Sequence, residues 1–149
     1  MTIKTGKEYI ESLRKRKLTV YLFGEKIKNP VDHPIIKPSI NSLAATYDVA
    51  NDPKYEDLAT ATSHLTGEKI NRFTHIHQNT QDLVKKVKLL RLLGQKTGTC
   101  FQRCVGMDAL NTLSSVTYEM DQKLQTQFYG RFTEFLKHVQ KNDLVCCGA

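Results

Sequence analysis

The sequence predicts a mainly α-helical protein, a helical bundle that carries one small β hairpin. Two observations favour this fold class. Apolar residues recur at helical spacing over several long segments, whereas the β-prone runs are short. Hydrophobic residues make up 40% and charged residues 25% of the 149 residues, a balance typical of one globular domain with a buried core.

The N-terminal part of the chain predicts a helix, a hairpin and an extended connector. Thr5 can cap a helix over residues 5–16, and Glu8 follows three positions later, as in a capping box. Residues 19–27 combine a short β-prone run with a glycine turn, which predicts a small hairpin. Residues 29–38 contain three prolines and should form an extended connector.

The middle of the chain predicts shorter elements. Ser39 should cap a helix that ends near residue 49, and a short helical piece is expected over residues 55–58. Residues 60–73 are polar and β-branched, so they predict a loop with a strand or two.

Three longer helices should follow, over residues 80–94, 99–123 and 125–142. The last should bury Phe128, Phe132, Phe135, Leu136 and Val139. The first should bury Leu83, Val84, Val87 and Leu90, and its buried stripe should be widened by Leu89, Leu92 and Leu93. We expect residues 1–142 to form an N-terminal helical domain and residues 143–149 to begin a following domain that has been cut off.

Localisation is predicted from what the sequence lacks. No apolar run approaches the roughly 20 residues that a membrane-spanning helix requires. Residues 1–4 are not followed by the apolar segment of a signal peptide. We therefore expect a cytoplasmic protein without a membrane partner, in which cysteines are reduced.

Cys100 and Cys104 are the chemistry-bearing pair of this sequence. On one helical face, positions four apart have Cβ atoms roughly 5–6 Å apart. That is too far for a disulfide, whose Cβ atoms lie about 3.8 Å apart, but a metal or cluster can lie between the sulfurs. Arg103 and the start of the helix should favour thiolates. The alternative is two buried cysteines on a core face.

Two sulfurs cannot complete a zinc or iron–sulfur site, because both use four ligands. His64, His75 and His77 are local candidates for further ligands. His75 or His77 together with the two cysteines would make a zinc-stabilised structural domain.

The formal net charge of +7 leaves a different alternative open. Basic residues cluster over residues 14–17 and 85–91, which is compatible with a helical module that binds nucleic acid. However, aromatic residues are not interleaved with these charges, and the clusters are also typical of solvated helix faces.

Residues 94–109, which contain the core Cys-Phe-Gln-Arg-Cys, closely resemble the cluster-binding stretch of the 4-hydroxybutyryl-CoA dehydratase family. The likeness extends in order along nearly the whole chain, through residues 23–27, 31–34, 38–41, 70–73, 81–88 and 142–144. Related flavin-dependent aromatic hydroxylases share the fold but lack these cysteines.

The resemblance implies the N-terminal domain of an acyl-CoA dehydrogenase-like fold. It also implies a homotetrameric carbon–oxygen lyase of anaerobic 4-aminobutyrate fermentation, dependent on FAD and a [4Fe–4S] cluster. Such an enzyme converts 4-hydroxybutyryl-CoA to crotonyl-CoA, isomerises vinylacetyl-CoA, and takes an acyl-CoA rather than a nucleic acid.

The resemblance also assigns residues. Cys100 and Cys104 correspond to two of three cysteine ligands, and Gln102 corresponds to a glutamine near the substrate. The third cysteine, a histidine ligand and most FAD contacts would lie beyond Ala149. The chain is therefore expected to be an N-terminal fragment, inactive alone and with free thiols.

Overall fold

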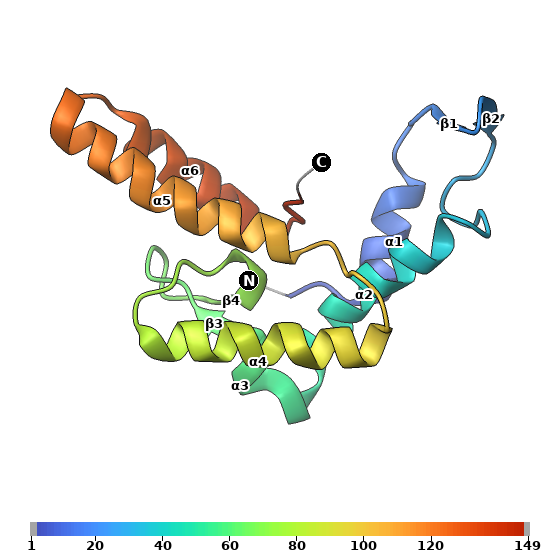
Figure 1. Cartoon of the computed structure of the whole chain (residues 1–149), viewed down its shortest axis with the longest axis horizontal. Helices are drawn as coiled ribbons and strands as arrows, with labels where there is room; N and C mark the ends of the chain where they lie inside the picture. The colour runs from blue at the N-terminus through green and yellow to red at the C-terminus, as the bar shows by residue number, and fades with distance from the viewer. Residues whose placement is uncertain (1–2, 148–149) are drawn as a thin grey trace.

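Helices dominate the computed structural model, which describes residues 3–147 and is shown in Figure 1. This confirms the mainly α fold class and the predicted hairpin. The strands expected within residues 60–73 are also present, and they pair in a second, separate two-stranded sheet. The elements in order are α1 (Gly6–Arg14), β1 (Val20–Leu22), β2 (Glu25–Ile27), α2 (Lys37–Asn51), η1 (Pro53–Tyr55), α3 (Glu56–Ala59), β3 (Thr60–Thr62), β4 (Lys69–Asn71), η2 (Arg72–Thr74), α4 (Thr80–Thr97), α5 (Cys104–Leu124) and α6 (Phe128–Lys141).

The first helix has the predicted capping box. The backbone N–H of Glu8 donates to Thr5 Oγ1 at 3.2 Å, and the Thr5 N–H donates to the Glu8 carboxylate at 2.7 Å. Helix α1 packs along α2, where a Cβ at Gly6 would lie 2.8 Å from the Ala44 carbonyl oxygen. The antiparallel β1–β2 hairpin lies at the far end of this helix pair (Figure 1), with Val20 opposite Ile27.

The start of α2 differs from the prediction. The helix begins at Lys37, and Pro38 lies in its first turn, so the expected cap at Ser39 is wrong. Proline suits this position because its fixed φ is helical and its missing N–H would have no helical partner there.

Two groups of buried apolar residues form the core. The first is built mainly by α2, α4, η2 and the start of α5, and contains Ile3, Val49, Ala50, Ala59, Phe73, Leu89, Leu93, Phe101 and Met107. The second lies between α5 and α6 and contains Ile76, Leu110, Phe132, Leu136 and Val139.

Some residues expected in the core are exposed. On α6, Phe132 is buried as predicted, whereas Phe128 and Phe135 are exposed. On α4, Leu89 and Leu93 are buried as predicted, whereas Leu83, Val84 and Val87, which were also expected in the core, are exposed. The predicted stripes were too wide, because one helix of this fold contacts the core along a narrower face.

None of the helices within residues 3–147 combines the length and the apolar character needed to cross a bilayer.

Candidate functional site

The candidate site is the connection between α4 and α5, residues 99–104, which we call the cysteine loop. Helix α4 ends when Gly98 adopts a left-handed conformation with φ of 62°. Cys100 therefore lies in the loop and is exposed, while Cys104 is the first residue of α5 and is partly buried. The predicted helix from residue 99, and with it the shared helical face, is wrong.

The cysteine loop alternates between inward and outward side chains. Phe101 and Arg103 are buried, whereas Cys100 and Gln102 are exposed and Cys104 is partly buried. The backbone bends here, because Gln102 has a left-handed φ of 58° and Arg103 has a right-handed helical conformation. The bend exposes Cys100 and Gln102, whereas Cys104 packs against the edge of the first core group.

Two contacts hold the first half of the loop on the domain. The Phe101 ring packs on Phe73 with centroids 5.8 Å apart, and Ser42 Oγ donates to the Cys100 carbonyl oxygen at 3.1 Å. Gln102 has a φ of 58°, and its backbone N–H donates to Cys100 Sγ at 3.4 Å. A left-handed glutamine is unfavourable, and such conformations cluster at functional sites.

Arg103 anchors the second half of the loop in the core. Its guanidinium lies over the rings of Tyr47 and Phe73, 4.4 Å and 4.9 Å from their centroids. It also donates to Thr46 Oγ1 at 3.1 Å and to Asp143 Oδ1 at 3.3 Å. Because these contacts occupy the guanidinium, Arg103 anchors the loop in the core.

Residues 143–147 pack beside this anchor. The Asp143 carboxylate is buried and accepts a hydrogen bond from the Lys4 backbone N–H at 3.0 Å, while Tyr47 Oη donates to the Asp143 carbonyl oxygen at 2.9 Å. Cys146 lies against Gly106 of α5, so closely that a side chain at Gly106 would overlap the Cys146 backbone. Burial raises the pKa of the Cys146 thiol.

Sequence reasoning missed Tyr47, Asp143 and Gly106 as residues that shape the site. Tyr47 and Asp143 are 96 residues apart, so no local spacing connects them. For the burial of Arg103 the sequence carried no local signal, because its neighbour Gln102 is polar and the partners that make burial possible come from distant segments.

The thiols fit a shared cluster better than a closed zinc site. All four cysteines, Cys100, Cys104, Cys146 and Cys147, are free. Within residues 3–147, no group of three or more His, Cys, Asp or Glu side chains converges to hold a metal. The predicted zinc ligand His75 instead contacts Asp82, with Nε2 3.0 Å from Oδ2. The described residues thus offer two free thiols near the surface, one exposed and one partly buried. A four-ligand site on them would need further ligands from elsewhere.

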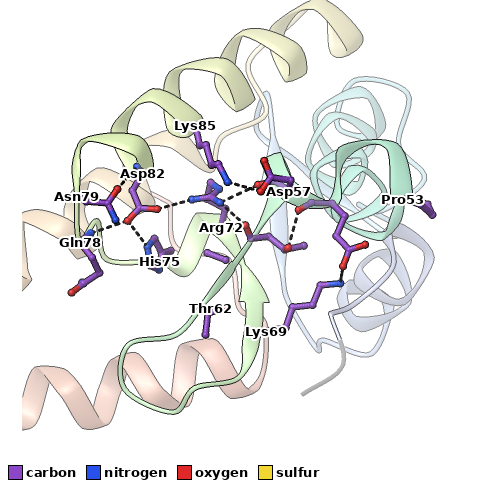
Figure 2. Close-up of a pocket in the computed structure, with 13 residues that line it drawn as sticks. Pro53, Asp57, Thr62, Lys69, Arg72, His75, Gln78, Asn79, Asp82 and Lys85 are labelled. Atoms are coloured by element: carbon purple, nitrogen blue, oxygen red, sulfur yellow. Dashed lines mark hydrogen bonds and ion pairs between the residues drawn. The ribbon is translucent and has the colours of Figure 1, made fainter.

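A polar cleft of about 790 Å³ lies on another part of the molecule, between α3, β3, β4 and α4 (Figure 2). Arg72 forms its floor and donates to the carbonyl oxygens of Asp57, Leu58 and Thr60 at 2.6–3.2 Å. It also donates to Asp82 Oδ1 at 3.1 Å. The Arg72 guanidinium already donates to these four acceptors of the chain, so we interpret Arg72 as a structural tie that joins the elements around the cleft.

The Asp82 carboxylate, which contacts both Arg72 and His75, is ionised. Burial opposes its ionisation, but the Gln78 backbone N–H, His75 and Arg72 together hold its pKa at about 2, below the usual 3.8. A carboxyl whose folded-state pKa is depressed contributes stability that is present above the unfolded pKa and is lost as the pH falls through the folded pKa.

Replacement of Asp82 with Asn should therefore lower the free energy of unfolding by about 2 kcal/mol at pH 7. The difference from the wild type should shrink as the pH falls from about 5 towards 2. Urea unfolding across this range measures it. Asp108→Asn, which removes an exposed carboxylate on α5, is the control. An equal loss at both positions, or one independent of pH, would contradict the role of Asp82.

The structure also bears on the basic clusters. In the cluster over residues 85–91, Lys85 forms an ion pair with Asp57, and Lys86 forms one with Asp108. These partners reduce the positive field that binding to nucleic acid would require.

With this geometry in place, comparison with known proteins defines the family. Residues 5–149 match the family described as 4-hydroxyphenylacetate 3-hydroxylase N terminal, and the chain belongs to this family. Among its relatives is the 4-hydroxybutyryl-CoA dehydratase/vinylacetyl-CoA-Delta-isomerase of Clostridium aminobutyricum. The two are 60% identical over 147 residues, which is 99% of this chain and 30% of that protein.

Solved structures agree. An oxygen-tolerant archaeal 4-hydroxybutyryl-CoA dehydratase from N. maritimus superposes with a TM-score of 0.92 and 58% identity, over 97% of this chain and 28% of that one. The oxygenase component of 4-hydroxyphenylacetate 3-monooxygenase, solved with FAD, has a TM-score of 0.71 and 23% identity over 95% of this chain and 29% of that one, and shares the fold. The chain spans about three tenths of the length of these relatives.

Proposed function

We propose that this chain is the N-terminal part of a dehydratase that converts 4-hydroxybutyryl-CoA to crotonyl-CoA and isomerises vinylacetyl-CoA. In this proposal Cys100 and Cys104 are two ligands of a [4Fe–4S] cluster. The observation that carries it is the 60% identity, over 99% of the chain, to a protein named for both activities. A homotetrameric assembly and a cytoplasmic location belong to the same proposal.

The donor set of the cysteine loop supports the cluster assignment. Thiolates are the ligands that iron–sulfur clusters use, and both thiols are free, with Cys100 exposed and Cys104 partly buried at the edge of the core. The remaining ligands and most of the FAD site would come from the rest of the protein. When bound, the cluster and the flavin would supply Lewis-acid polarisation of the leaving hydroxyl and one-electron chemistry.

The chain's own contribution is placement. Phe101 and Arg103 fix the loop on the core, so that Cys100 and Cys104 can hold the cluster at the surface of this domain. Gln102 has a left-handed backbone conformation, and its side-chain amide is exposed in the same segment as the two cysteines. We propose that this amide hydrogen-bonds the acyl-CoA substrate beside the cluster.

Anaerobic reconstitution of the full-length protein with iron, sulfide and FAD tests the proposal. We expect about four irons per chain, flavin absorption, and formation of crotonyl-CoA from 4-hydroxybutyryl-CoA. A protein that binds flavin without iron, and that hydroxylates a phenol instead, would overturn it.

A further inference from the structure

We propose that Arg103 is the positioning residue of the cysteine loop. Its buried guanidinium, held over Tyr47 and Phe73 and bonded to Asp143, sets the placement of Cys100 and Cys104 for an iron–sulfur cluster. This inference rests on the proposed function, because it concerns how the two thiols are presented.

The burial of Arg103 is the first observation. Only 1% of its surface is exposed, which makes it the largest fully buried side chain among the described residues. A buried guanidinium is costly unless it is paired and hydrogen-bonded, and a well-packed apolar side chain is often at least as stable in its place. Its position directly before Cys104 therefore suits a role in specifying geometry.

The partners of Arg103 come from separate parts of the chain. Thr46 and Tyr47 lie on α2, Phe73 lies in η2, and Asp143 follows α6. Asp143 is itself fixed, because its carboxylate accepts from the Lys4 N–H and its carbonyl oxygen accepts from Tyr47. The guanidinium is thus held from three sides.

This anchor acts on the thiols through the backbone. Arg103 and Phe101 point inward on either side of Gln102, so the intervening residue is held in its left-handed conformation. Ser42 fixes the Cys100 carbonyl oxygen at the other end of the segment. If Arg103 loses its partners, the start of α5 can shift while Cys100 stays in place, and the relation between the two thiols changes.

The test uses the full-length protein with Arg103→Lys and Asp143→Asn. Lysine keeps the charge but cannot reproduce the planar stack, and asparagine keeps the shape of Asp143 but removes its charge. Arg72→Lys is the matched control, because Arg72 is also buried and paired with an aspartate, and it lies outside the cysteine loop.

Arg103→Lys and Asp143→Asn, which we call the loop variants, should bind iron at least about tenfold more weakly than the wild type. The electron paramagnetic resonance spectrum of the reduced cluster should also change in both. In iron-free protein, maleimide should label Cys104 faster in both variants. Arg72→Lys should lower the melting temperature comparably yet leave iron retention, spectrum and labelling at wild-type values. If Arg103→Lys does not fold, Asp143→Asn carries the test.

Iron retention, spectrum and Cys104 labelling that stay at wild-type values in the loop variants would overturn the positioning role. So would equal changes in Arg72→Lys, because they would follow from lost stability alone. A wild-type protein that takes up no iron would overturn the proposed function instead. In that case the labelling of Cys104 in iron-free protein still decides whether Arg103 positions the loop.

Discussion

Replacing both Cys100 and Cys104 with alanine in the full-length protein should abolish cluster binding and reduce dehydratase activity by about 10³-fold or more. The polarisation of an oxygen by a metal centre contributes several kcal/mol to transition-state stabilisation, and each 1.36 kcal/mol is a factor of ten in rate. Iron analysis and the rate of crotonyl-CoA formation measure the two effects.

The thiols can be removed without disturbing the fold. Cys100 is exposed and Cys104 is partly buried, so truncation to alanine should leave the free energy of unfolding within about 1 kcal/mol of the wild type. Cys147→Ala, which removes another exposed thiol, is the matched control and should keep both iron and activity. A double variant that retained its cluster would exclude these two residues as ligands.

Gly106→Ala should have the largest effect on stability of any methyl-sized change in the chain that we describe. Its Cβ would overlap the backbone of Cys146 and lie 2.8 Å from the Cys146 Cβ. Backbone cannot move aside as a flexible side chain can, so we expect a loss of about 3 kcal/mol, or displacement of residues 143–147. Thermal unfolding, together with faster maleimide labelling of Cys146, measures both outcomes.

Gly94→Ala on α4 and Gly130→Ala on α6 are the controls for Gly106. Both glycines lie within helices, and an added Cβ meets open space at either position. Alanine should stabilise these helices by about 0.5–1 kcal/mol, because glycine loses more conformational entropy on folding. A Gly106→Ala protein as stable as the controls would show that α5 does not need this close approach.

Local chemistry explains which elements were predictable. The capping box at Thr5 and Glu8 is contained within four residues, so the start of α1 followed directly from the sequence. The helical spacing that predicted α6 is likewise local, although Phe128 and Phe135 are exposed. For these segments the interactions that select the conformation lie close together along the chain.

A break between α4 and α5 was predicted, but its position, after residue 98 and not before it, could not be predicted in this way. Residues 99–103 have ordinary helical character, and the structure is decided by distant partners: Phe73 for the Phe101 ring, Ser42 for the Cys100 carbonyl oxygen, and Asp143 for Arg103. These contacts stabilise a bent, non-helical segment in place of a continued helix. Secondary-structure preference is weak enough for tertiary packing to override it.

The sequence alone therefore determined the helical fold class and the donor groups of the candidate site, because composition, apolar periodicity and the identity of two thiols are properties of the chain itself. Only the tertiary structure decided how those thiols are presented. In the folded chain Cys100 lies outside the helix, Cys104 is the first residue of α5, and Arg103 between them is buried. The physical reason is that a guanidinium can be buried only where partners from distant segments meet, and that meeting exists only in the folded chain.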